Sequence, residues 1–298
     1  MTRPGRLITA MVTPFDDKGE VDYQQAKRLA QALFESGSDG LVLSGTTGES
    51  PTLTREEKLR LFSEVKSVVG KGVIAGTGSY STRESIELTR EAEKAGADAI
   101  LLVVPYYNKP TQEGLYQHFK AIAGSTSLPC ILYNVPGRTV TNLAAETVVR
   151  LSKIDNIAGV KEASANLEQI ARIIEDTDEG FLVYSGNDSD TFPVLALGGY
   201  GVISVASHVA GNQIKDMMEK VLGGRMEEAA DIHRKLIPLV NALFVVANPI
   251  PVKHALNYLG FPVGKPRLPL LEPDEKSRAV IETTLKAYTI DFPSQYLK

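Results

Sequence analysis

Eight short apolar segments recur along the 298-residue chain, and their spacing constrains the fold more than any other feature. Each is followed by a few Gly, Ser, Thr, Asn or Pro residues and then by a longer segment with helical periodicity. Successive segments start between 20 residues (181 to 201) and 34 residues (6 to 40) apart, the length of one β-α-β unit. The predicted strands are Arg6–Val12, Gly40–Ser44, Gly72–Gly76, Ala99–Pro105, Pro129–Asn134, Ile157–Glu162, Phe181–Ser185 and Gly201–Ala206.

The segments between these strands predict amphipathic helices, with apolar residues recurring every three or four positions. Examples are Asp22–Glu35, Arg55–Val69, Thr82–Ala95 and Gln112–Ala123. Almost continuously apolar strands, such as residues 100–104, are typical of a parallel sheet that is covered on both faces. Eight such units predict a closed (β/α)8 barrel, the TIM barrel.

An open doubly wound sheet is the alternative fold, and it usually carries a glycine fingerprint for a dinucleotide. Here Gly76-Thr77-Gly78 follows a strand, but Ser81 stands where the third glycine would fall. We therefore expect a barrel without a dinucleotide site.

The strand pattern stops near Gly224, and the remaining segments predict helices at Met226–Ala247, Pro251–Leu259 and Pro273–Lys286. We expect a catalytic barrel at residues 1–224 and a C-terminal helical region at residues 225–298. The segment from Asn248 to Lys253 predicts a helix start, with Asn248 as the capping residue and prolines in the first turn.

Composition narrows the possible partners. The 32 basic and 36 acidic residues give a net charge of −4 without a basic cluster, so we expect no nucleic acid partner. No apolar segment approaches the roughly eighteen residues of a membrane helix, and no signal peptide is visible, so we expect a cytoplasmic protein with no membrane partner. Cys130 lies in an apolar segment and is expected to be a buried, inert thiol.

Lys161 is the most informative single residue, because it lies in the otherwise apolar strand 157–162. Burial of an ammonium group is costly and favours the neutral amine, the form that attacks a ketone or aldehyde to give a Schiff base. The alternative is a lysine whose head reaches water or Glu162. Tyr133 ends the preceding strand and is suited to proton transfer at an imine, unless it is a tyrosine with an apolar body and a solvated hydroxyl.

Two further rim segments carry polar groups. Thr46 and Thr47 follow the second predicted strand, and their hydroxyls and backbone N–H groups are suited to hold a small carboxylate, or form an ordinary turn. Arg138 follows the fifth strand, where its planar guanidinium is suited to bind a second carboxylate, or to pair with a surface acid.

Three motifs in this order carry a resemblance: Gly45-Thr46-Thr47-Gly48-Glu49, Tyr133-Asn134-Val135-Pro136 and Gly159-Val160-Lys161. Together they resemble the pyruvate-dependent class I aldolases of the dihydrodipicolinate synthase and N-acetylneuraminate lyase superfamily. Residues 106–119 and 137–139 are similar to the dihydrodipicolinate synthase family within it. The resemblance runs from Leu7 to at least Leu259.

The resemblance implies a Schiff-base-forming lyase of lysine and diaminopimelate biosynthesis, which condenses pyruvate with L-aspartate 4-semialdehyde. Lys161 would form the Schiff base with pyruvate, and Tyr133 would be the proton donor and acceptor. Thr46 would join Tyr133 in a proton relay completed by Tyr107 of a neighbouring subunit.

The family pattern also implies binding residues. Thr47 would hold the pyruvate carboxylate, with the backbones of Gly186 and Ile203 lining the same pocket. Arg138 would receive the carboxylate of L-aspartate 4-semialdehyde. The family implies no metal or organic cofactor, in agreement with the absence of ligand spacing among the four histidines, and a homotetramer built as a dimer of dimers.

Alternatives to this function remain. A sibling lyase that cleaves a sugar acid, of the N-acetylneuraminate or 2-keto-3-deoxygluconate type, would share Lys161 and Tyr133. A catalytically silent barrel that serves binding or assembly is the other alternative.

One family feature differs: positions that often form a lysine-inhibition pocket carry Arg55, Lys58 and Tyr80 in this sequence. The added positive charge predicts weak or absent inhibition by lysine.

Overall fold

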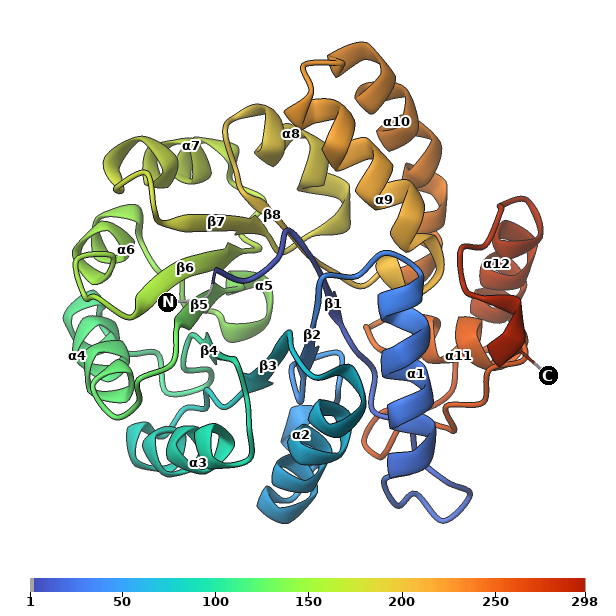
Figure 1. The fold of residues 1–298 in the computed structure, drawn as a ribbon, viewed down its shortest axis with the longest axis horizontal. Helices are drawn as coiled ribbons and strands as arrows, with labels where there is room; N and C mark the ends of the chain where they lie inside the picture. The colour runs from blue at the N-terminus through green and yellow to red at the C-terminus, as the bar shows by residue number, and fades with distance from the viewer. Residues whose placement is uncertain (1–2, 298) are drawn as a thin grey trace.

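The computed structural model describes residues 3–297 and shows a closed barrel of eight parallel strands surrounded by helices (Figure 1). Neighbouring strands pair in chain order, and β8 pairs with β1 to close the barrel. Each observed strand lies within its predicted segment, so the (β/α)8 prediction is confirmed and the open sheet is excluded. The strands are β1 (Leu7–Ala10), β2 (Gly40–Leu43), β3 (Val73–Gly76), β4 (Ala99–Val103), β5 (Cys130–Asn134), β6 (Ile157–Glu162), β7 (Leu182–Ser185) and β8 (Gly201–Ser204).

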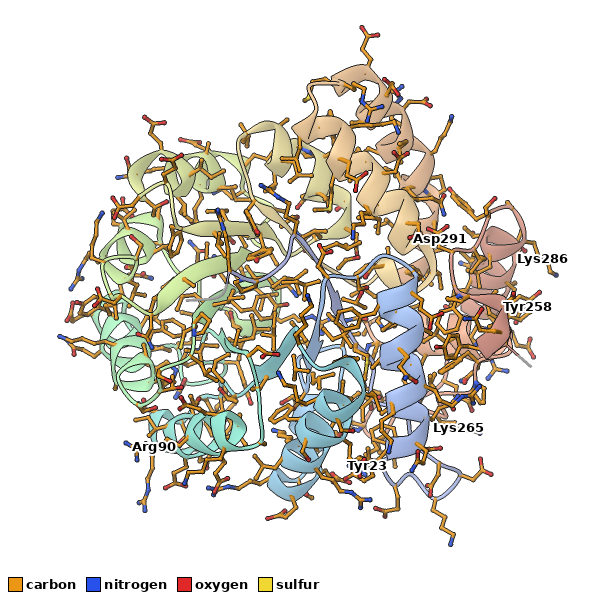
Figure 2. The ribbon with its side chains drawn as sticks, viewed as in Figure 1. Tyr23, Arg90, Tyr258, Lys265, Lys286 and Asp291 are labelled. Atoms are coloured by element: carbon orange, nitrogen blue, oxygen red, sulfur yellow. The ribbon has the colours of Figure 1, made fainter. Side chains whose placement is uncertain are left out.

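Five of the helices around the barrel begin after a residue whose side chain caps them. Asp22 accepts from Gln25 N at the start of the first helix, and Thr54 and Glu57 form a capping box at the start of the second. The helices are α1 (Tyr23–Glu35), α2 (Arg55–Val69), α3 (Thr82–Lys94), α4 (Gln112–Ala123), α5 (Pro136–Thr139), α6 (Ala145–Leu151), α7 (Leu167–Asp176), α8 (Thr191–Ala196) and α9 (Ser207–Leu222). Those with a side-chain cap are α1 to α4 and α7. Charged side chains such as Arg90 extend outward from them (Figure 2).

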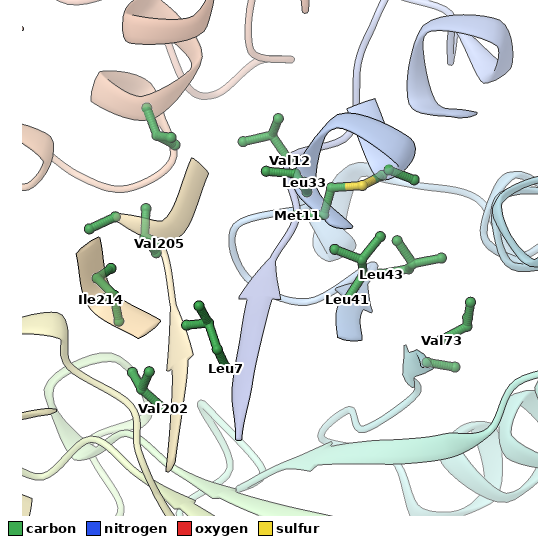
Figure 3. Close-up of a cluster of buried hydrophobic side chains, with 14 of the residues drawn as sticks. Leu7, Met11, Val12, Leu33, Leu41, Leu43, Val73, Val202, Val205 and Ile214 are labelled. Carbon is green, nitrogen blue, oxygen red and sulfur yellow. The ribbon is translucent and has the colours of Figure 1, made fainter. Parts of the chain in front are cut away.

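Alternating residues of the strands face two different buried layers, because successive side chains of a strand point to opposite faces. On β1, Ile8 belongs to the cluster that fills the barrel interior with Ile203 and Val42. Leu7 belongs instead to the larger cluster between strands and helices, together with Leu33 of α1 (Figure 3). The interior is therefore packed, and substrates have access to the strands only at the ends of the barrel.

Three further helices follow the barrel in the C-terminal part of the chain: α10 (Met226–Leu243), α11 (Ile250–Tyr258) and α12 (Glu275–Lys286). α10 packs against α9, and α11 packs against α12 (Figure 1). The predicted helix Met226–Ala247 was wrong in its last four residues, because α10 ends at Leu243. Buried residues of this region, such as Leu239 and Val252, belong to the same hydrophobic cluster as the barrel helices. Across residues 3–297, no helix is long and apolar enough to cross a membrane.

Candidate active site

Lys161 and Tyr133 lie side by side at the carboxyl ends of adjacent strands. Tyr133 on β5 is in register with Lys161 on β6. The Lys161 Nζ atom lies 4.3 Å from the centroid of the Tyr133 ring, and both side chains are buried. The expectation that these two residues are neighbours at the rim is therefore confirmed. A buried amine beside a phenol has the two groups that Schiff-base chemistry needs, a nucleophile and a proton carrier.

The carboxylate that follows Lys161 in sequence is engaged elsewhere. Glu162 accepts from Asn134 Nδ2 and from Gln169 Nε2, each at 2.9 Å. Burial raises the pKa of Glu162, and these hydrogen bonds lower it in part. The alternative in which Lys161 is a structural partner of Glu162 is thus not observed.

Asp188 is a buried carboxylate that joins the loop after β7 to the end of β8. Its Oδ2 atom accepts from the backbone N–H groups of Val205 and Ala206, each at 3.0 Å, and Ser204 Oγ donates to its other oxygen. Burial raises the pKa of Asp188, whereas these hydrogen bonds and the charge of Lys161 lower it. The sequence motifs did not assign a role to this residue.

Gly186 directly follows β7, and Ile203 lies on β8, the two strands that come after the strand of Lys161. Gly186 N donates to the carbonyl of Glu162 at 2.7 Å, and a Cβ at position 186 would lie 2.6 Å from Ala163 Cβ. Only glycine allows this close approach of the two strand ends. Ile203 on β8 is fully buried and in register with Ile8 of β1.

The turn after β2 carries the two threonines. Thr47 is buried, and its Oγ1 atom accepts from Asn248 Nδ2 at 2.8 Å. Thr46 is half-buried, and its carbonyl accepts from Glu49 N at 3.1 Å. A cavity of about 230 Å³ opens beside this turn, and its lining includes Thr46, Tyr106, Tyr133 and Arg138. The structure thus brings the β2 turn, the end of β5 and α5 around one cavity.

Arg138 and Tyr107 differ in their position relative to this cavity within a single chain. Arg138 lies on α5, is exposed, and donates from Nη2 to the carbonyl of Asn248 at 3.3 Å. Tyr107 is 93% exposed, and it is Tyr106 that lines the cavity. Within one chain, therefore, the cavity includes Arg138 and not Tyr107.

Asn248 is the site residue that sequence reasoning interpreted wrongly. The prediction made it the cap of a helix, but Pro249 occupies the N-cap position of α11, and no side chain caps this helix. Asn248 instead contacts Thr47 through its side chain and Arg138 through its carbonyl. Of the two prolines expected in the first turn, Pro251 is confirmed there, whereas Pro249 lies one position before the helix. The sequence signal was present, but its local interpretation missed the long-range contact.

Several residues named from the sequence do not line this cavity: Lys161, Thr47, Gly186, Ile203 and Cys130. Burial raises the pKa of the Cys130 thiol to about 12, which confirms the expected buried thiol. Burial lowers the pKa of both His118 and His208 to about 4. Within residues 3–297, no three His, Cys, Asp or Glu side chains are grouped so that they could hold a metal ion.

A second cavity of about 330 Å³ lies next to the first, and Tyr106 and Ser50 line both. It is lined by Arg55, Lys58 and Tyr80, the positions at which this sequence differs from the lysine-inhibited pattern. Arg55 Nε lies 2.6 Å from Glu91 Oε2, and burial lowers the pKa of Lys58. The three residues named from the sequence therefore face one shared cavity.

Comparison with known proteins identifies relatives along nearly the whole chain. A sequence model described as the dihydrodipicolinate synthetase family matches residues 3–288. The chain is 64% identical over 295 residues to the 4-hydroxy-tetrahydrodipicolinate synthase of Dehalococcoides mccartyi strain CBDB1, covering 98% of this chain and 99% of that one. It is 54% identical over 284 residues to the synthase of Bacillus subtilis strain 168, covering 94% of this chain and 98% of that one.

Solved structures show the same similarity. The dihydrodipicolinate synthase of Bacillus anthracis aligns with a TM-score of 0.94 at 48% identity, covering 97% of this chain and 99% of that chain. The enzyme of Cyanidioschyzon merolae, solved with lysine bound, aligns with a TM-score of 0.93 at 51% identity, covering 95% of this chain and 97% of that chain. The fold, the order of the motifs and these likenesses agree, and the chain belongs to the dihydrodipicolinate synthetase family.

Proposed function

We propose that this chain condenses pyruvate with L-aspartate 4-semialdehyde, the activity of a 4-hydroxy-tetrahydrodipicolinate synthase in lysine and diaminopimelate biosynthesis. One observation carries the proposal: a buried lysine, Lys161, lies in register with Tyr133 at the mouth of the barrel, with Nζ 4.3 Å from the ring centroid. The relatives named above bear this activity in their names, and the chain shares 64% identity with one of them.

The reaction follows from these two residues. The Lys161 amine attacks the ketone carbon of pyruvate, and water leaves to give a protonated imine. The imine withdraws electrons, so a methyl proton is lost and an enamine forms, with Tyr133 carrying protons to and from the reacting groups. The enamine carbon attacks the aldehyde of the second substrate. The amine of that substrate then displaces Lys161 as the ring closes, which regenerates the free lysine.

The surrounding groups bind the two carboxylates. Thr47 and the backbones of Gly186 and Ile203 hold the carboxylate of pyruvate, and Arg138 binds that of L-aspartate 4-semialdehyde. The guanidinium of Arg138 is suited to this task because its planar fork donates two parallel hydrogen bonds to a carboxylate. A site for a polyol sugar acid has less use for a fixed cation at this position, so Arg138 supports the semialdehyde over the sugar acid.

Assembly completes the proposed site. Thr46 relays protons between Tyr133 and Tyr107 of a neighbouring subunit, and the 93% exposure of Tyr107 supports a role across an interface. We infer a homotetramer made of two dimers, located in the cytoplasm and without a metal or organic cofactor. Residues 1–224 supply the reacting groups, and residues 225–298 support them.

Turnover of the purified protein tests the proposal. Pyruvate and L-aspartate 4-semialdehyde are supplied together, and the cyclic product is followed by mass spectrometry. We expect product from this pair and none from N-acetylneuraminate or 2-keto-3-deoxygluconate. Cleavage of a sugar acid without condensation would assign the chain to a sibling lyase, and inactivity toward all substrates would favour a silent barrel.

A further inference from the structure

A buried ion pair joins the turn after β2 to the first turn of α11, apart from the groups that the mechanism uses. Glu49 Oε1 and Lys253 Nζ lie 2.9 Å apart, and both side chains are 1% exposed. Lys253 also donates to the carbonyls of Thr13 and Lys265, each at 3.1 Å, so all three of its N–H groups have acceptors. Glu49 Oε2 accepts from Arg267 N at 2.8 Å. Both charged groups are therefore fully engaged.

The pair is a poor candidate for a purely stabilising contact. Burial lowers the pKa of Lys253 to about 8, although the charge of Glu49 raises it, so the amine is protonated at pH 7. Removing two charges from water costs free energy that their attraction seldom exceeds. We therefore consider which part of the chain this ion pair holds in place, rather than how much it stabilises the fold.

That geometry concerns the turn of residues 46–49. Glu49 has a positive φ of 57°, a conformation that non-glycine residues seldom adopt without surrounding support. Thr13 Oγ1 donates to the carbonyl of Gly48 at 2.7 Å. Three contacts reach the turn from more than 200 positions away in sequence: Lys253 and Arg267 at Glu49, with separations of 204 and 218, and Asn248 at Thr47, with a separation of 201.

The contact at Thr47 determines how its hydroxyl is used. A threonine hydroxyl carries one proton and two acceptor lone pairs. Because Asn248 Nδ2 donates to Thr47 Oγ1, the hydroxyl proton remains available for a different acceptor. A carboxylate accepts hydrogen bonds and donates none, so it is the matching ligand. The Asn248 side chain thus orients Thr47 as a donor.

We propose that Asn248 and Lys253 are positioning residues, which hold the turn of residues 46–49 so that the Thr47 hydroxyl donates to the carboxylate of pyruvate. This inference rests on the proposed function. Asn248 divides its contacts, because its side chain meets Thr47 and its backbone carbonyl meets Arg138. A side-chain truncation at Asn248 therefore acts on pyruvate and leaves the binding of the second substrate intact.

The first experiment measures the KM of each substrate for Asn248→Ala. Loss of one hydrogen bond is expected to raise the KM for pyruvate about threefold to tenfold, with the KM for L-aspartate 4-semialdehyde unchanged. In a Thr47→Val background, Asn248→Ala is expected to add nothing. The matched control is Asn257→Ala, because Asn257 bonds only backbone groups of the C-terminal region, at Gly264 and Val263.

The second experiment removes both charges of the pair with the double variant Glu49→Gln/Lys253→Met, which avoids a buried, unpaired charge. We expect the KM for pyruvate to rise again while thermal unfolding shows a folded protein. Lys265→Met is the control, since Lys265 is an exposed lysine of the same region (Figure 2).

Four results separate the possibilities. Equal changes in both KM values, or a full Asn248→Ala effect in the Thr47→Val background, would overturn the positioning role. Unchanged KM values for pyruvate in folded variants would overturn it as well. If instead the wild-type protein shows no turnover, the proposed function fails.

Discussion

Two sides of the candidate site are held in place in different ways. On one side, Lys161 and Tyr133 are fixed by the register of adjacent strands β5 and β6. On the other side, Thr47 lies in a turn that Asn248 and Lys253 contact from the C-terminal region. The first side is part of the barrel itself, whereas the second depends on helices that the barrel alone does not contain.

This difference shows where the C-terminal region acts. Strand register positions Lys161 and Tyr133, the proposed reacting groups, and it needs only the β-α-β repeat. The long-range contacts position Thr47, the proposed binding group for pyruvate. Substitutions on the two sides should therefore give different kinetic signatures: changes in kcat for the strand pair, and changes in KM for the turn.

Tyr133→Phe is expected to have the largest effect of the substitutions considered for this comparison. It removes the hydroxyl that carries protons and should lower kcat about 10²- to 10⁴-fold, with little change in the KM for pyruvate. Steady-state kinetics with both substrates measure this. Tyr184→Phe is the matched control, because Tyr184 is in register with Lys161 on its other side and its hydroxyl donates to the carbonyl of Gly5. A loss confined to KM would contradict the role of Tyr133.

Arg138→Ala tests the role of a residue that connects the two sides of the site, because Arg138 follows β5 and donates to the carbonyl of Asn248. Loss of the charged hydrogen bonds should lower kcat/KM for L-aspartate 4-semialdehyde about 10- to 100-fold. Formation of the pyruvate adduct on Lys161 should be unaffected. Equal loss of both activities would show that the assigned role of Arg138 is wrong.

His208 lies outside the Lys161–Tyr133 pair and the turn of residues 46–49, and its burial predicts how folding stability depends on pH. It accepts from Val12 N through Nε2, and its pKa is lowered to about 4 by burial. The unfolded chain, with a histidine pKa of about 6.5, binds more protons than the folded chain between these two pKa values, so folding stability falls as pH drops through this window. Urea unfolding should show this fall to be less steep in His208→Gln, by about 1.4 kcal/mol per pH unit. Identical slopes would count against a buried neutral histidine.

Lysine is expected to have the smallest effect. Arg55 and Lys58 add positive charge to the second cavity, which disfavours a cationic ligand. Turnover should therefore change little on addition of lysine to a steady-state assay. Potent inhibition would reject this prediction and would show that Glu84 and Glu87, the two acidic residues that also line this cavity, outweigh the added cations.

The strands of the barrel and the Lys161–Tyr133 pair could be predicted from the sequence. Both depend on local periodicity and on the order of the β-α-β repeats, and these can be read directly from the sequence. Asn248 depends on a contact 201 positions away, and local rules made it a helix cap. Lys253 carried a usable signal, because it lies among buried apolar residues of α11, as Lys161 does in β6.

The central claim is that Lys161 forms a Schiff base with pyruvate. The most direct measurement is to incubate the protein with pyruvate and borohydride, digest it, and locate the reduced adduct by mass spectrometry. The account predicts one adduct, on the peptide that contains Lys161, and its loss in Lys161→Ala. Absence of an adduct from the wild-type protein, or an adduct on Lys253 in place of Lys161, would contradict the account.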